Sequence, residues 1–201
     1  MKRVVIASGN PGKLRELSAL LEPLGVEAVP QSDFSIPEAE EPHFTFLENA
    51  LAKARHASRL TGLPALADDS GLCVPALHGE PGVHSAYYAG KEGGREERDA
   101  RNNAKLVAEL HAAPDPSAFY YCVLVLVRDA DDPTPIVADG TWHGKIAREP
   151  RGANGFGYDP YFVVRGGKLT AAELPAAEKN RASHRGQALA ALAAKLGNAR
   201  A

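Results

Sequence analysis

The pattern of hydrophobic and polar positions predicts that the chain opens with a strand, a tight loop and a helix. Residues 4–6 form an apolar run rich in β-branched side chains, which is typical of a buried strand. Leu14, Leu17 and Leu21 recur at helical spacing and predict a helix. The turn formers of residues 8–12 therefore join the end of the strand to the start of the helix.

Strand and helix patterns continue to alternate along the rest of the chain. Thr45 and Glu48 form a capping box that predicts the start of a helix, and Gly62 closes it. A highly charged stretch with apolar residues on one face predicts a helix over residues 95–110. An alanine-rich amphipathic helix follows Ser183. Apolar runs predict strands at residues 26–29, 64–67, 119–127, 136–142 and 161–164, the third and fourth as a hairpin.

The first loop has the composition of a phosphate-binding site. Backbone N–H groups at the start of a helix have no helical partner, glycines let an anion approach them, and a lysine adds positive charge. The candidate phosphate-binding residues are Ser8, Gly9, Asn10, Pro11, Gly12 and Lys13. The alternative is an ordinary turn, because the spacing matches neither the Walker A motif nor Gly-x-Gly-x-x-Gly.

Two adjacent carboxylates, Asp68 and Asp69, follow the predicted strand at residues 64–67. Ligands of open α/β sheets bind at the carboxyl ends of strands. Because adjacent residues project differently, one aspartate can hold a metal while the other orients it or polarises water. The alternative is an Asp-Asp-Ser-Gly turn without chemical function.

Three further charged residues are candidates for the same site. Glu40 and Glu41 lie in an acidic segment between prolines, which is either a solvated loop or turns one carboxylate toward a cation. Lys53 lies on the helix that Thr45 opens, and points either into a cleft or into water.

The glycine-rich loop at residues 152–160 carries Phe156, Tyr158 and Asp159, two flat rings and a hydrogen-bond acceptor. Stacking combined with an edge contact is the chemistry of a base pocket, although an aromatic loop packed on the core is an equally good interpretation. His184 and Arg185 fall in the first turn of the last helix. A cation there opposes the helix dipole, which slightly favours a ligand contact.

Composition limits the classes of protein that this chain can be. Its 201 residues form one large domain or two small lobes, and a hydrophobic fraction of 44% is ordinary for a globular protein. The net charge of −2 provides no general attraction to a nucleic acid polymer or to a membrane, and no apolar run is long enough to span a bilayer. Cys73 and Cys122 are predicted to be reduced thiols, which suits a cytoplasmic protein.

Taken together, these motifs resemble the inosine triphosphate pyrophosphatase family, also called Ham1-like. The residues that carry the resemblance occur in order over nearly the full length: Ser8-Gly9-Asn10 with Lys13, Glu40-Glu41, Thr45-Phe46 with Glu48-Asn49-Ala50, Lys53-Ala54, 67–72, Pro81-Gly82 with Ser85-Ala86, 155–160, 172–174, Glu178-Lys179-Asn180 and Ser183-His184-Arg185. Tyr87 departs from the pattern, since bacterial members often carry arginine there, which puts in doubt only a contact made by that side chain.

The resemblance implies an α/β fold with an elongated mixed sheet and flanking helices, forming a single domain over residues 1–201 with two lobes around a central cleft. It implies a Mg²⁺-dependent homodimer that hydrolyses the triphosphates of inosine, xanthosine and deoxyinosine to the monophosphate and pyrophosphate. Two alternatives stay open: a Maf-like pyrophosphatase with another base preference, and a protein that binds nucleotides without turnover.

The resemblance also implies a role for each candidate residue. Residues 8–13 and Lys53 would contact phosphates, with Ser70 as a further substrate contact. Asp69, with Glu41 or Glu40, would hold the metal and activate water beside Asp68. The base pocket would consist of Phe156, Gly157, Tyr158, Asp159, Lys179, His184 and Arg185. The oxygen at position 6 of hypoxanthine and xanthine accepts a hydrogen bond, whereas adenine has an amino donor there, so a guanidinium such as Arg185 can distinguish them.

Overall fold

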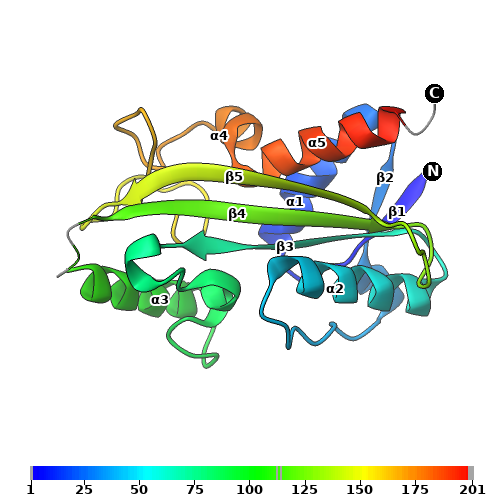
Figure 1. The fold of residues 1–201 in the computed structure, drawn as a ribbon, viewed down its shortest axis with the longest axis horizontal. Coiled ribbons are helices and arrows are strands. Elements are labelled where there is room, and N and C mark those ends of the chain that lie inside the picture. The colour runs from blue at the N-terminus through cyan, green and yellow to red at the C-terminus, as the bar shows by residue number, and fades with distance from the viewer. Residues whose placement is uncertain (1, 112, 114, 199–201) are drawn as a thin grey trace. The chain divides into compact units, whose positions relative to one another are not determined.

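The computed structural model describes residues 2–111, 113 and 115–198 (Figure 1). The chain divides into two compact units. Unit 1 comprises Met1–Asp69, Cys122–Gly140 and Arg185–Ala201, and unit 2 comprises Ser70–Tyr121 and Thr141–His184. Among the described residues, no helix combines the length and the apolarity that crossing a bilayer requires.

Six strands form one mixed sheet in the order β2-β1-β3-β4-β5-β6. β1 runs parallel to both β2 and β3, whereas β6 is antiparallel to β5. The predicted α/β fold with a mixed sheet and flanking helices is confirmed (Figure 1). The strand bounds are β1 Arg3–Ile6, β2 Glu27–Pro30, β3 Ala65–Cys73, β4 Ser117–Val127, β5 Ile136–Ile146 and β6 Phe162–Val164.

In unit 1, helices cover both faces of the sheet. α1 (Pro11–Leu21) and α5 (His184–Asn198) share one apolar cluster with β1 and β3, in which Leu17 and Leu189 meet Ile6 and Leu66. Side chains alternate along a strand, so the neighbours of Ile6 and Leu66 face the opposite side. On that side α2 (Phe46–Thr61) packs against β1 through small side chains, with Ala50, Ala54 and Ala57 fully buried (Figure 1).

Unit 2 is built around an aromatic cluster. Tyr120 of β4, Trp142 of β5 and Phe162 of β6 pack with Leu106 of α3 (Arg95–Leu110) and with Leu174, which precedes α4 (Ala176–Ala182). Four short 3₁₀ helices complete the described elements: Glu22–Leu24 and Gln31–Phe34 in unit 1, and Pro75–Leu77 and Gly82–Tyr87 in unit 2.

The structure corrects two predictions of secondary structure. β3 does not end at residue 67 but continues to Cys73, so the Asp-Asp-Ser-Gly segment is extended strand and not a turn. β4 is its neighbour in the sheet and gives the strand a partner beyond the last residues that pair with β1. α4 was not predicted, because its seven residues are too short to show a helical period.

Candidate functional site

Side chains of the loop between β1 and α1 accept hydrogen bonds from some of the backbone N–H groups there. Asn10 is the N-cap of α1, and its Oδ1 accepts hydrogen bonds from the backbone N–H of Gly12 (2.9 Å) and of Lys13 (3.3 Å). The prediction that these N–H groups have no partner is therefore wrong for Gly12 and Lys13, because an asparagine at this position caps the helix. Ser8 Oγ in turn accepts from the N–H of Asn10 at 3.2 Å.

The loop approaches an acidic side chain that the sequence did not single out. A Cβ at Gly9 would collide with Oε1 of Glu38, so the absence of a side chain at Gly9 makes room for this carboxylate. Glu38 is exposed and has a flexible side chain. An anion that reaches the loop would have to displace it.

Asp68 and Asp69 are consecutive in β3 and enter different environments. The alternation of side chains places Asp68 on the side of Leu66, which α1 and α5 cover, and Asp69 on the side of α2. The prediction that adjacent aspartates project differently is confirmed, because Asp68 pairs with Lys13 and Arg185 whereas Asp69 pairs with Lys53. Ser70 follows in the same strand and is half-buried.

Asp68 is buried among donors from three elements. Lys13 Nζ of α1 lies 2.6 Å from Oδ1, while Arg185 Nε of α5 (2.7 Å) and Cys122 Sγ of β4 (3.1 Å) donate to Oδ2. Burial would raise the pKa of this carboxyl, but the charges of Arg185 and Lys13 outweigh burial and hold the pKa well below its usual range. Asp68 is therefore ionised at neutral pH and pairs with two cations.

Asp69 forms an ion pair with Lys53 of α2. Lys53 Nζ lies 2.8 Å from its Oδ1 and 2.6 Å from Oε1 of Glu41. Burial raises the pKa of Asp69, and the opposing charges of Lys53 and Lys13 do not fully compensate. Its Oδ2 is buried and accepts no hydrogen bond from any residue that the structure describes. A carboxylate of raised pKa with one unused oxygen is suited to accept a proton from water.

The acidic segment is fastened to α2, which explains how Glu41 reaches Lys53. Asn49, one helical turn before Lys53, accepts from the N–H of His43 (3.1 Å) and donates to its carbonyl (3.2 Å). Both predicted glutamates are exposed, and Glu41 is the one that contacts the lysine. Burial works to lower the pKa of Lys53, but Asp69 and Glu41 outweigh it and raise that pKa, so the lysine is charged.

The donor set suits a hard divalent cation only if the substrate supplies further ligands. Within residues 2–111, 113 and 115–198, no group of three or more His, Cys, Asp or Glu side chains could hold a metal ion. Mg²⁺, however, is commonly bound through one or two carboxylates together with substrate phosphates and water. Asp69 Oδ2 and the partly exposed Glu41 provide two such oxygens, so these residues fit Mg²⁺ in the presence of a triphosphate.

In unit 2, the predicted base-pocket loop exposes one ring. Of the two rings in this loop, that of Tyr158 is buried and that of Phe156 is half-exposed. Asp159 is buried as well. Asp159 Oδ2 accepts from Phe156 N–H and from Lys179 Nζ, both at 2.8 Å, and Tyr120 donates to its Oδ1. Tyr158 donates its hydroxyl hydrogen to the carbonyl of Ser85. The buried Asp159 therefore holds the loop through hydrogen bonds to Phe156, Lys179 and Tyr120. Tyr158 packs in the core, as the alternative interpretation of an aromatic loop expected.

The two residues at the start of α5 belong to different clusters. His184 stacks on Tyr120 in unit 2, with ring centroids 4.7 Å apart and planes within 9°. Arg185 lies in unit 1, is 2% exposed, and pairs with Glu16 of α1 as well as with Asp68. Sequence reasoning missed Glu16 and Cys122. The three-residue spacing of Lys13 and Glu16 on one helix face was the available signal for Glu16, whereas the apolar strand around Cys122 offered none.

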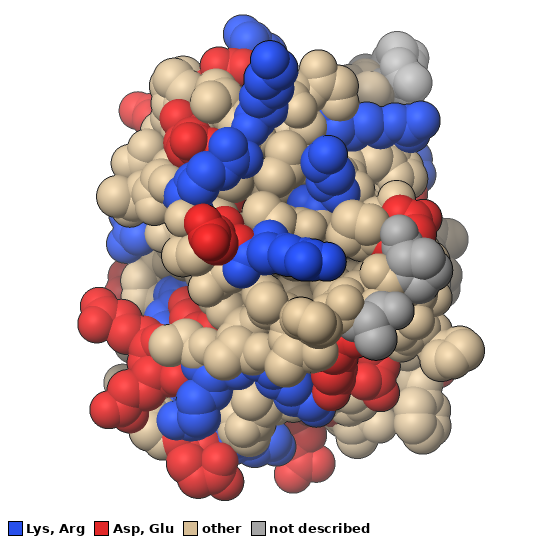
Figure 2. Space-filling view, turned by 90° about the vertical axis from the view of Figure 1, so that its left-hand side faces the viewer, with Lys and Arg blue, Asp and Glu red and all other residues tan. Residues whose placement is uncertain are grey.

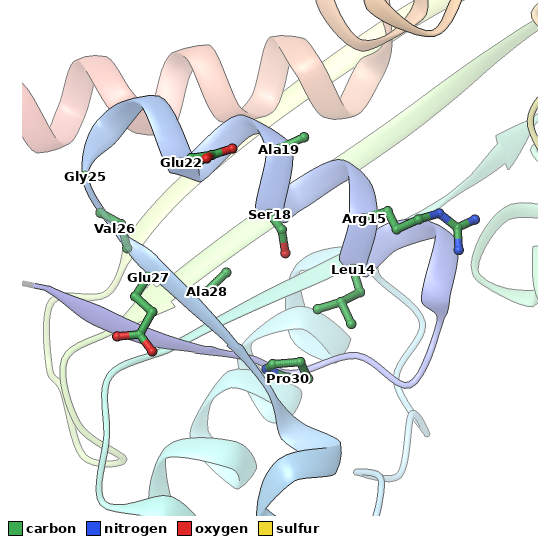
Figure 3. Close-up of a pocket in the computed structure, with 10 residues that line it drawn as sticks. All are labelled: Leu14, Arg15, Ser18, Ala19, Glu22, Gly25, Val26, Glu27, Ala28 and Pro30. Atoms are coloured by element: carbon green, nitrogen blue, oxygen red, sulfur yellow. The ribbon is translucent and has the colours of Figure 1, made fainter.

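A separate hollow of about 700 Å³ lies in unit 1 between α1 and β2 (Figure 3). Leu14 and Ser18 point toward β2 there, and Glu27 and Ala28 line the other side. None of the predicted site residues lines it. The candidate chemistry is therefore concentrated at Asp68 and Asp69 and not in this hollow.

Comparison with known proteins agrees with the resemblance drawn from the sequence. A model of the Ham1 family matches residues 4–195. The chain belongs to the Ham1 family. Among its relatives, proteins named dITP/XTP pyrophosphatase from Burkholderia pseudomallei and Chromobacterium violaceum are 62% and 63% identical to it. These matches cover 98% and 96% of this chain, and 95% and 96% of the relatives.

Solved structures of Ham1 family members share the fold. A HAM1 protein from Coxiella burnetii is 50% identical and superposes with a TM-score of 0.89, covering 98% of this chain and 100% of that one. A structure from Mycobacterium abscessus, titled nucleoside-triphosphatase and dITP/XTP pyrophosphatase, is 49% identical with a TM-score of 0.73. The match covers 94% of this chain and 98% of that structure.

Proposed function

We propose that this Ham1 family member hydrolyses dITP, ITP and XTP to the corresponding monophosphate and pyrophosphate. The observation that carries the proposal is the difference between the contacts of Asp68 and those of Asp69. Asp68 pairs with Lys13, Arg185 and Cys122, whereas Asp69 keeps one oxygen that accepts no hydrogen bond from the described residues. The relatives named dITP/XTP pyrophosphatase, which match over nearly the whole chain, supply the substrate class.

In this proposal Asp69 takes the proton of the attacking water, because it is the carboxylate with an unused oxygen and a raised pKa. Lys53 holds Asp69 and Glu41 together and offers its ammonium to a phosphate. Lys13 brings a second cation from the start of α1, where the remaining loop residues approach the phosphates. Asp68 holds Lys13 and Arg185 in place.

Asp69 and Glu41 would hold Mg²⁺. When bound, this ion supplies neutralisation of the phosphate charge in the transition state. Without a cation, two carboxylates beside a triphosphate would only repel it. The proposal of Mg²⁺ dependence therefore rests on the chemistry of these carboxylate donors, which share Lys53 as an ion-pair partner.

For the base, we assign stacking to Phe156, the half-exposed ring of unit 2, with Gly157, Tyr158, Asp159, Lys179 and His184 as its supporting residues. Reading of the oxygen at position 6 by Arg185 stays a prediction, as does the homodimer in the cytoplasm. The Maf-like alternative loses its support, because the chain belongs to the Ham1 family. A binding protein without turnover is separated from an enzyme by assay alone.

The decisive experiment is a panel of nucleoside triphosphates incubated with Mg²⁺, in which pyrophosphate and orthophosphate are measured separately. We expect pyrophosphate from dITP, ITP and XTP, little turnover of ATP, and loss of activity in excess EDTA. Release of orthophosphate in place of pyrophosphate would refute the proposed products. Absence of any turnover would favour the binding protein.

A further inference from the structure

Helix α3 carries a stripe of polar side chains that meets the aromatic loop of unit 2. Arg95, Asp99 and Asn103 are four residues apart, so they lie along one face of the helix. The stripe begins in the first turn of α3, where Arg95 and Asp99 are about one-third exposed, and ends at Asn103, which is 6% exposed. A buried amide at the inner end of a polar stripe points to a defined task.

Two members of the stripe hold the backbone at Gly157. Asp99 Oδ2 accepts from the N–H of Gly157 at 3.1 Å, and Asn103 Nδ2 donates to its carbonyl at 3.0 Å. Gly157 has a φ of +62°, a left-handed conformation that glycine adopts without strain. Because glycine leaves this stretch without a side chain to anchor it, its conformation depends on partners from outside the loop.

These contacts hold the backbone on both sides of Phe156. The Cα of Phe156 is flanked by its own N–H and by that of Gly157. Asp159 accepts from the first and Asp99 from the second, so the peptide groups on both sides of the ring are held by carboxylates. The guanidinium of Arg95 lies 4.8 Å from the ring centroid and 3.8 Å from Asp99, and the ammonium of Lys179 lies 5.0 Å from the same centroid.

We propose that Asp99 and Asn103 are positioning residues for base recognition, which set the orientation of the Phe156 ring on which a purine base stacks. The inference rests on the proposed function, since it needs a purine nucleotide as the ligand. It adds to that function a second element, α3, through which the affinity for purine nucleotides can be changed without altering a residue that touches the base.

The experiment is a double-mutant cycle between α3 and the ring. Kd for inosine monophosphate is measured by calorimetry, and KM and kcat for ITP by turnover, in the wild type, Asp99→Ala, Phe156→Ala and the double variant. We expect Asp99→Ala to raise both Kd and KM about threefold to tenfold, as for a lost hydrogen bond, with kcat nearly unchanged. In the Phe156→Ala background the same change should have no further effect.

Equal increases caused by Asp99→Ala in both backgrounds would overturn the proposal, because Asp99 would then act independently of the ring. Asp99→Asn keeps an acceptor for the Gly157 N–H and should recover most of the lost affinity. Asn103→Ala provides the same test should Asp99→Ala fail to fold, as judged by circular dichroism. Glu96→Gln, an exposed change in the first turn of the same helix, is the control and should alter neither constant.

Failure of the proposed function gives a different pattern. If the wild type binds inosine monophosphate but does not release pyrophosphate from ITP, the hydrolytic proposal fails while the cycle in Kd still tests α3. If Phe156→Ala leaves Kd unchanged, the ring does not stack on the base, and the positioning proposal fails with that assignment.

Discussion

Lys53 Nζ lies 2.8 Å from Oδ1 of Asp69, on the side of β3 that faces α2. This contact leaves the other oxygen of Asp69 without a hydrogen bond from any residue that the structure describes. Asp68, the preceding residue of β3, has Lys13, Arg185 and Cys122 as partners. The two carboxylates are thus distinguished by their partners and not by their residue type.

Asp69→Asn should reduce kcat for ITP by on the order of a hundredfold or more, the scale on which removal of a general base acts. The amide cannot take a proton from water, although it preserves the shape of the side chain. Turnover is measured at saturating Mg²⁺, with circular dichroism to verify folding. Near-normal turnover would show that another group is the base.

Lys13→Ala and Lys53→Ala should each raise KM by roughly 10- to 100-fold, which corresponds to loss of one charge-assisted hydrogen bond to phosphate. Because neither lysine is assigned to the base, the factor should be the same for ITP, XTP and dITP. Lys168→Ala, an exposed lysine of unit 2, is the matched control. A factor that differs among the three bases would place these lysines at the base.

Asp68→Asn should lower the free energy of unfolding by about 3 kcal/mol, because it removes the buried charge that Arg185 and Lys13 share and leaves Arg185 with Glu16 alone. Urea denaturation measures the change. Asp131→Asn, at a carboxylate that is 94% exposed beside Arg59, should cost less than about 0.5 kcal/mol. Similar values for the two variants would mean that the buried pair adds nothing beyond a surface pair.

The proposed roles of Arg185 and Phe156 are distinguished by their effects on base selectivity. Phe156→Ala should weaken all purine nucleotides together by roughly 1–3 kcal/mol. Arg185→Ala should instead narrow the ratio of kcat/KM between ITP and ATP, since it removes a donor that suits one base and opposes the other. The ratio is unaffected by a loss of folded protein. An unchanged ratio in Arg185→Ala, with a collapsed ratio in Phe156→Ala, would assign selectivity to the ring.

The thiol of Cys73 should be slow to alkylate at neutral pH. Burial raises its pKa to about 11, and only the thiolate reacts. The rate with iodoacetamide, followed by mass spectrometry of the Cys73 peptide, should keep rising through pH 10. In urea-unfolded protein the rate should level off near pH 9, the ordinary thiol value. A native rate that levels off at the same pH would contradict the burial of this side chain.

The surface charge gives no further guidance to a partner. On the face shown in Figure 2, basic and acidic side chains are interspersed, with blue more frequent in the upper part and red in the lower part. Such a mixture fits the small net charge of −2. We therefore expect recognition of a charged substrate to depend on local groups such as Lys13 and Lys53.

The sequence by itself determined most of the elements and the family. Hydrophobic periodicity and capping signals placed α2 between Thr45 and Gly62 and α3 over Arg95–Leu110, because these patterns are local and follow from the geometry of a helix. The ordered set of polar motifs likewise identified the Ham1 family, whose model matches residues 4–195.

Only the tertiary structure decided what each polar residue contacts. Alternation along β3 separates Asp68 from Asp69, but which side holds two cations depends on α1, α2 and α5, which are distant in sequence. Asn10 differs, because its side chain accepts from N–H groups only two and three residues away, a local contact of a kind that the sequence could have indicated. Partners contributed by other elements depend on packing, and no local pattern encodes them.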